Sequence, residues 1–269
     1  MHSDQEPYRE LYEAFLHYEG TALYADVVRP WVASHESERA WLASFAKRTG
    51  DPIPAATTEE IWRLYALSRI VDLLLLGLAP ADCKRFDSWG IETITRAEFA
   101  GFMESLGLRK IERAAFHPFF HEIVTVDALP DPESPIHIVD TYWPGYMLGP
   151  LLINRAGCGV AAGTNQLTKE IAEHSTLYWA FARRTRPRED QSMGWGSNSQ
   201  WRTSFRRDYA IDGMLYYNVD DENKSHKPDE LLDEAERLEL LRFRCFVRST
   251  KPHEDRLPYH ETYREREPE

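Results

Sequence analysis

The run TTEEIWRLYALSRIVDLLLLGL at residues 57–78 is the clearest helical pattern in the chain. Thr57 is a candidate helix N-cap, and Glu60 follows three residues later, which is the spacing of a capping box. The second half of the run is apolar nearly all round, a pattern that is typical of a helix in the centre of a fold. Its apolar part, residues 70–78, is far shorter than the ~20 residues that a membrane span needs. We therefore expect a long central helix and no membrane partner.

Helical spacing continues on both sides of this run. Apolar residues recur at intervals of three and four in YRELYEAFLHY, residues 8–18, and in ERAWLASFAKR, residues 38–48. In ITRAEFAGFMESLG, Thr95 and Glu98 have the spacing of a second capping box. The sequence therefore predicts that residues 1–115 are mainly helical.

The pattern changes near residue 116. The segments HEIVTVDAL and HIVDTYW are short, alternating and β-branched, so they read as strands, and the Pro-rich LPDPESP between them reads as a loop. YMLGPLLINR and CGVAAG are interpreted as two further strands or a kinked pair, and MLYYNVD as another strand. Helical spacing returns in residues 165–184 and 227–246. Residues 116–250 are therefore expected to mix strands with helices.

These patterns predict an α+β fold. A helical N-terminal half would pack on a C-terminal half that holds a small, mainly antiparallel sheet and two or more helices. No repeat and no break in composition separates two domains, so residues 1–250 are expected to form one domain. Residues 251–269 are nearly all charged or Pro, and we expect a disordered or loosely docked tail there.

Charge and cysteine content exclude several classes of function. The formal net charge of −12 repels phosphate backbones and argues against nucleic-acid binding. Cys83, Cys158 and Cys245 are scattered and include no CxxC pair, so we expect neither a disulfide framework nor a thiolate zinc site. Cys158 has Gly neighbours, but an inert buried thiol is the favoured interpretation. MHSDQEPYRE has no apolar region that would signal secretion, and the sequence predicts a cytoplasmic protein with reduced thiols.

The segment HPFFHE, residues 117–122, brings together groups that transfer protons or bind metals. His117 and His121 are four residues apart, and His174 is a candidate third ligand. The proline after His117 disfavours helical geometry there, and HExxH is absent. We therefore expect no metal and no cofactor, and assign His121, Glu122 and His174 to proton transfer. The competing interpretation is that the histidines are core or cap residues satisfied by hydrogen bonds.

SMGWGSNSQWRTSFRRDY, residues 192–209, is too rich in Trp and Arg for a plain linker. Trp side chains supply flat apolar walls, and guanidinium groups suit carboxylate or phosphate. The segment is expected either to line a site for a small anionic ligand or to brace the core. We expect Trp195 to be buried and at least one nearby Arg to pair inward, because an unpaired buried charge is costly. The candidate ligand-binding residues are Trp195, Asn198, Arg202, Arg206, Arg207 and Asp208.

Two functions fit these patterns. The first is an enzyme that acts on a small polar, anionic metabolite, with a Trp- and Arg-lined pocket and with His and Glu as acid–base groups. The aromatic segment DTYWPGY, residues 140–146, would form the opposite wall of that pocket. The alternative is a non-catalytic binding, immunity or regulatory protein whose Trp- and Arg-rich loop is structural. Convergence of the His, Glu and Arg groups in one place would favour the enzyme.

Overall fold

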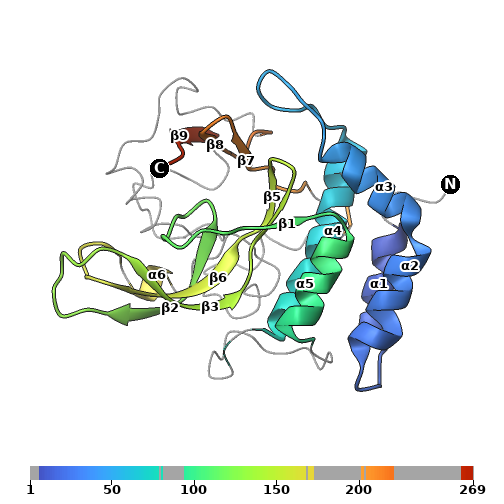
Figure 1. Ribbon diagram of the computed structural model, residues 1–269, viewed down its shortest axis with the longest axis horizontal. Coiled ribbons are helices and arrows are strands. Elements are labelled where there is room, and N and C mark those ends of the chain that lie inside the picture. Colours follow the sequence, from blue (N-terminus) through green and yellow to red (C-terminus); the bar gives the residue numbers. More distant parts are fainter. Residues whose placement is uncertain are drawn as a thin grey trace, which may run out of the picture.

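The computed structural model describes residues 6–78, 80, 94–167, 169–172, 201–202, 204–220 and 262–268. Its first half is helical. The helical elements are α1 (Glu6–Leu16), the π-helical turn η1 (Tyr24–Val28), α2 (Arg29–Ser34), α3 (Glu36–Phe45), α4 (Thr58–Leu76) and α5 (Arg96–Ser105). Helices α4 and α5 stand between the strands on one side and α1, α2 and α3 on the other (Figure 1).

Helix α4 is the central helix that the sequence predicts. Its capping box is present, because Thr57 Oγ1 accepts the Glu60 N–H at 3.3 Å and the Glu60 carboxylate accepts the Thr57 N–H at 2.9 Å. Thr95 and Glu98 form the second predicted box at the start of α5. Helix α4 packs against α1 and against strand β5 (Leu151–Asn154), which accounts for its apolar composition. No helix in the described part of the chain combines the length and the apolar composition that a membrane crossing requires.

Six strands form an antiparallel sheet. Gly149, with φ of +57°, lies between β4 and β5, and the Asp212–Gly213 pair, with φ of +50° and +74°, forms the turn between β7 and β8. An Asp-Gly pair suits such a two-residue hairpin, because both residues take positive φ. The strand order is β1 (Arg109–Lys110), β4 (Tyr146–Leu148), β5, β7 (Tyr209–Ile211), β8 (Met214–Tyr217) and β9 (Tyr263–Arg266).

A second sheet has three strands, in the order β2 (His121–Ala128), β6 (Ala156–Ala162) and β3 (His137–Trp143). Strand β2 pairs with β6 in parallel, and β3 pairs with β6 antiparallel. The short helix α6 (Lys169–Ala172) lies against β2, and Lys169 Nζ donates to the Val126 carbonyl at 2.8 Å. This bond satisfies one carbonyl of a strand that lies at the sheet edge.

The α+β class and the change of pattern near residue 116 are confirmed, and the finer fold prediction needs correction. The C-terminal half holds two sheets in place of one small sheet, and in its described residues it is mostly strand. Helix α6 covers a small part of the predicted helix at 165–184, and residues 227–246 lie outside the described residues. Alternation along a strand identifies a buried face but not its neighbours, so it did not separate the two sheets.

Of the tail that was expected to be disordered or loosely docked, residues 262–268 lie docked against the six-stranded sheet. Residues of β9 pair with β8 in four register positions, and Glu265 is fully buried. The prediction considered apolar burial alone, but this segment docks through polar contacts that composition does not reveal. The other residues of the tail, 251–261 and 269, lie outside the described residues.

Candidate functional site

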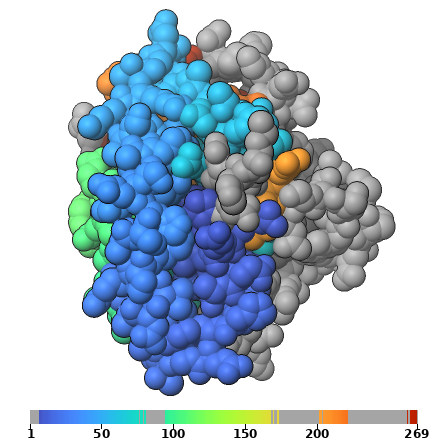
Figure 2. All heavy atoms as spheres, turned by 90° about the vertical axis from the view of Figure 1, so that its right-hand side faces the viewer, coloured from blue at the N-terminus to red at the C-terminus, as the bar shows by residue number. Residues whose placement is uncertain are grey.

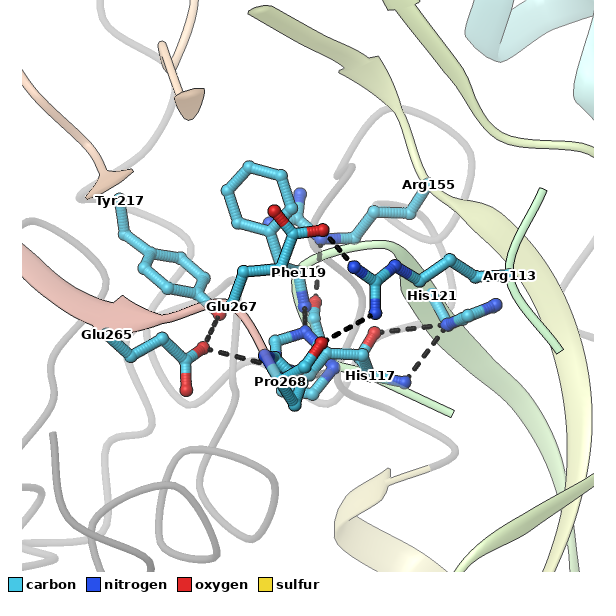
Figure 3. Close-up of polar contacts among 10 residues, drawn as sticks. Arg113, His117, Phe119, His121, Arg155, Tyr217, Glu265, Glu267 and Pro268 are labelled. Carbon is cyan, nitrogen blue, oxygen red and sulfur yellow. Dashed lines mark hydrogen bonds and ion pairs between the residues drawn. The ribbon is translucent and has the colours of Figure 1, made fainter. Parts of the chain in front are cut away.

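The two histidines of the HPFFHE segment hold the turn that precedes β2 (Figure 3). The His117 N–H donates to His121 Nδ1 at 3.1 Å, and the Phe119 N–H donates to His117 Nδ1 at 3.1 Å. Burial lowers the pKa of His121, and hydrogen bonds with the backbone of His117 and Arg113 oppose that effect in part. Both Nδ1 atoms are therefore engaged by the main chain, as the core-histidine interpretation expects.

The other ring nitrogen of His117 points to a buried carboxylate. His117 Nε2 lies 3.5 Å from Glu265 Oε1, and the Tyr217 hydroxyl donates to the same oxygen at 2.5 Å. Because Nδ1 accepts a main-chain N–H, the proton of neutral His117 is assigned to Nε2, which faces Glu265. This carboxylate comes from β9, which was expected to belong to the tail, so no local pattern placed it beside His117.

The third metal-ligand candidate, His174, lies outside the described residues. Within the ranges that the structure covers, no group of three or more His, Cys, Asp and Glu side chains is placed to hold a metal ion. The alternative of a metal site at His117, His121 and His174 therefore stays untested.

A buried network of Arg and Asp occupies the end of the SMGWGSNSQWRTSFRRDY segment. Asp208 accepts from Arg155 Nη2 at 2.8 Å, from Arg206 Nε at 3.0 Å and from the Asn218 N–H at 2.7 Å. Burial alone would raise the pKa of Asp208, but the charges of Arg206 and Arg155 outweigh it and lower the pKa. Arg155 also donates to the Pro118 carbonyl at 2.9 Å, which joins this network to the histidine turn.

Arg207 forms a second ion pair in the same segment. Its Nε and Nη2 donate to the two carboxylate oxygens of Asp220 at 2.7 and 2.5 Å, and its Nη1 donates to the Pro54 carbonyl and the Tyr209 hydroxyl. Inward pairing with a carboxylate is thus confirmed for Arg206 and Arg207. Arg202 is exposed and lies over the Trp62 ring, 5.6 Å from its centroid. The predicted residues Trp195 and Asn198 lie outside the described residues, so their positions stay a prediction.

Asp72 of α4 and Glu122 of β2 bring two buried carboxylates close together. Asp72 is 6 % exposed and Glu122 is 2 % exposed. Burial raises the pKa of Asp72 well above its ordinary value, the charge of Glu122 raises it further, and Arg69 opposes both. Asp72 Oδ1 makes no hydrogen bond within the described part of the chain. Asp72 therefore holds its proton more tightly than an ordinary aspartic acid does.

A cationic and aromatic group stands next to Asp72 on helix α4. Arg69 precedes Asp72 by three residues and so lies on the same face of the helix. Its guanidinium carbon lies 4.3 Å from the ring centroid of Trp201 and 4.7 Å from that of Tyr12. Figure 2 shows residues of the 201–220 range (orange) beside α1 (dark blue) on this face of the molecule. Trp201, from the Trp- and Arg-rich segment, thus contacts Arg69, whose charge lowers the pKa of Asp72.

The buried thiol of Cys158 contacts the main chain of Glu122. Cys158 Sγ donates to the Glu122 backbone carbonyl at 3.3 Å, and the side chain is fully buried. Burial, and then the Glu122 charge, raise the pKa of this thiol. A neutral thiol is a poor nucleophile, which agrees with the prediction of an inert cysteine.

Sequence reasoning chose Glu122 and missed Asp72. The signal was present, because Asp72 is a single carboxylate in the apolar run IVDLLLLGL of a helix expected to be central. A charge that is buried on all sides is costly, so its presence there marks a partner or a function. The partner could not be identified from sequence, because α4 and β2 are 45 or more residues apart in the chain.

Comparison with known proteins gives no match: no family model, no curated protein and no solved structure is similar to this chain. Neither a fold name nor an activity therefore comes from a relative.

Proposed function

We propose that this chain is an enzyme that acts on a small polar metabolite and uses Asp72 and Glu122 as its acid–base pair. The observation that carries the proposal is the burial of two nearby carboxylates on different elements, with the pKa of Asp72 raised. Two titratable groups whose surroundings separate their protonation states can serve as acid and base at one pH. Glu122 keeps the proton-transfer role that the sequence predicts.

The chemistry that we propose divides between the two carboxyl groups. Protonated Asp72 would donate its proton to a substrate oxygen or nitrogen, and ionised Glu122 would accept a proton from the substrate or from water. Arg69 would attract an anionic group of the substrate, and Trp201 would offer it a flat apolar wall. The roles proposed for His174, Trp195 and Asn198 stay predictions, and His121 supports the proposal less because its Nδ1 accepts a backbone N–H.

Comparison with other buried carboxylates in the chain supports a functional role for Asp72. Glu38 accepts hydrogen bonds from Tyr8 and Arg63, and Asp208 accepts them from two Arg side chains and one backbone N–H. Glu265 accepts a hydrogen bond from Tyr217. Asp72 Oδ1 has no such bond in the described residues. A carboxylate without these bonds destabilises the fold, which is a cost that catalytic groups commonly carry.

Two substitutions test the proposal: Asp72→Asn and Glu122→Gln. The purified chain is incubated with a mixture of small polar metabolites from a cell extract, and the mixture is followed by mass spectrometry. We expect the wild-type chain to convert at least one compound, and each substitution to slow that conversion about 100-fold or more. Asp127→Asn, at an exposed position of the same strand as Glu122, is the matched control and should keep the wild-type rate.

Stability separates a catalytic pair from a damaged fold. Because the pKa of Asp72 is raised in the folded chain, the free energy of unfolding falls as the pH rises above 3.8, the ordinary pKa of the group. Asp72→Asn removes this effect, so it should raise the free energy of unfolding at pH 7. Loss of conversion together with equal or higher stability supports the proposal. A wild-type chain that leaves the mixture unchanged, or variants that convert it as fast as the wild type, would overturn it.

One observation favours the alternative of a non-catalytic binding, immunity or regulatory protein. Arg206 and Arg207 pair with Asp208 and Asp220, as expected if the Trp- and Arg-rich segment braces the core. Under this alternative, a ligand or partner would bind equally well to the wild-type chain and to Asp72→Asn, and no metabolite would be converted. Metabolite conversion, together with binding to the wild-type chain and to Asp72→Asn, therefore separates the two functions.

A further inference from the structure

Residues 262–268 dock along an edge of the six-stranded sheet. Strand β9 pairs antiparallel with β8, with Leu215 opposite Glu265 and Tyr217 opposite Tyr263. Two contacts extend the docking beyond the strand: the Glu267 N–H donates to the Gly213 carbonyl at 2.9 Å, and Thr262 Oγ1 donates to the Asn218 carbonyl at 2.7 Å. Main-chain pairing therefore holds the whole segment in an extended form.

Two glutamates of this segment point into separate polar sites (Figure 3). They are two residues apart, so they lie on the same side of the strand. Glu265 is fully buried between Tyr217, which donates to its carboxylate at 2.5 Å, and His117 at 3.5 Å. Glu267 accepts a hydrogen bond from Arg113 Nη2, and Arg113 Nη1 donates to the Pro268 carbonyl at 3.2 Å. Both glutamates are thus recognised by side chains that lie outside β9.

The composition of the segment favours polar docking. TYREREP contains no Val, Leu, Ile or Met, and the contacts described above are main-chain pairing, hydrogen bonds and ion pairs. In water its charged side chains are well solvated, and Arg113 and Glu267 are each still 27 % exposed when docked. A segment that is held by main-chain pairing and a few polar contacts can leave an edge without unfolding the core.

We propose that the edge of β8 that β9 covers, together with Arg113, His117 and Tyr217, is a recognition groove for an extended peptide of the pattern Glu-X-Glu. The chain's own residues 262–268 occupy this groove as an exchangeable ligand. Main-chain hydrogen bonds to a sheet edge provide affinity, and sites for alternate side chains provide specificity, which is the established logic of strand addition. A protein partner that presents a strand of the pattern Glu-X-Glu would displace residues 262–268.

Peptide binding to the full chain tests the groove. The probe is a fluorescent synthetic peptide with the sequence TYREREP, and its anisotropy is followed as the chain is added. In the wild-type chain the internal segment competes, which weakens the apparent affinity. Replacing both internal glutamates, Glu265→Ala with Glu267→Ala, should tighten binding of the probe at least tenfold. Replacing two exposed glutamates elsewhere, Glu59→Ala with Glu104→Ala, should leave the affinity at the wild-type value.

One further probe and one further substitution test which contacts recognise the peptide. The probe TYRQRQP should bind the doubly substituted chain at least tenfold more weakly than TYREREP does. Adding Arg113→Ala to that chain should weaken TYREREP binding at least fivefold. Equal binding of the two probes, or no saturable binding of TYREREP to a folded double variant, would overturn the proposal.

Hydrogen exchange of the wild-type chain provides a test if the double variant fails to fold. The backbone N–H of Glu267, which is bonded to Gly213, should exchange at least 100-fold faster than the protected backbone N–H groups of β5, because the segment opens locally. Equal protection of both sets would show that residues 262–268 leave only when the whole chain unfolds, and would overturn the proposal.

Discussion

Arg207 and Asp220 form a two-point ion pair in which both carboxylate oxygens accept from one guanidinium, at 2.7 and 2.5 Å. The remaining nitrogen of Arg207 donates to the Pro54 carbonyl and to the Tyr209 hydroxyl. One buried side chain therefore connects β7, the turn after β8 and the loop before α4. This geometry needs the planar fork of Arg, because an ammonium group cannot reach four acceptors in this arrangement.

We expect Arg207→Lys to lower the free energy of unfolding by about 2–4 kcal/mol, since the charge stays buried while most of its hydrogen bonds are lost. Arg202→Lys is the matched control, because Arg202 is exposed, and its effect should stay within about 0.5 kcal/mol. Urea denaturation at pH 7 measures both. Equal effects of the two substitutions would show that the fork of Arg207 contributes nothing specific.

Glu60 and Glu98 occupy equivalent positions in two capping boxes, but only Glu60 has a guanidinium partner in the described residues. The hydrogen bond from Arg48 lowers the pKa of Glu60 to about 2 from its ordinary 4.5. Because the folded pKa is the lower one, the stability that Glu60 contributes is present above pH 4.5 and is lost as the pH falls towards 2.

Glu60→Gln should therefore lower the free energy of unfolding at pH 7 by about 1–2 kcal/mol, after allowance for solvent around the partly exposed Arg48. The difference from wild type should shrink as the pH falls from 4.5 to 2. Glutamine preserves the capping box, so Glu98→Gln should change little at any pH. A pH-independent loss in Glu60→Gln would show that the ion pair with Arg48 does not cause it.

His121 should make the chain less stable in mild acid. Its pKa is lowered by burial, so the unfolded chain takes up a proton near pH 6.5 before the folded chain does. The free energy of unfolding should fall as the pH drops from 6.5 towards the folded pKa of His121. His121→Asn keeps an acceptor for the His117 N–H and should make this fall smaller.

The control for His121 is His137→Asn, because His137 is exposed on β3. The urea midpoint of His137→Asn should fall between pH 7 and pH 5 by as much as the midpoint of the wild-type chain does. If His121→Asn loses as much stability between the two pH values as wild type does, His121 is not the group that titrates.

Local patterns predicted those parts of the fold that depend on near neighbours. The capping boxes at Thr57 and Thr95 and the strands on either side of LPDPESP were found because each depends on residues a few positions apart. The division into two sheets was not found, because Cys158 and Leu152 read as similar apolar strand residues and yet belong to different sheets. Which strands become neighbours depends on long-range packing that no local pattern contains.

Some residues of the candidate site were predicted from local patterns, and others were missed. Glu122 was selected because it stands beside two histidines, and Arg206 and Arg207 were expected to pair inward because Trp burial would draw them towards the core. Asp72 and Glu265 were missed, since each acquires its role from a residue more than 40 positions away. A charged residue in an apolar helix, or in a polar tail, has no visible partner until the chain is folded.

The pKa of Asp72 is the most direct test of the central claim, that Asp72 and Glu122 form an acid–base pair in which the Glu122 charge raises the pKa of Asp72. Carbon NMR of the chain with labelled aspartate carboxyl groups measures it, with Asp72→Asn used to assign the signal. We expect the pKa of Asp72 to lie well above 3.8 and to fall in Glu122→Gln, because burial and the Glu122 charge both raise it. An Asp72 carboxyl that titrates at or below 3.8 and is unaffected by Glu122→Gln would contradict the claim.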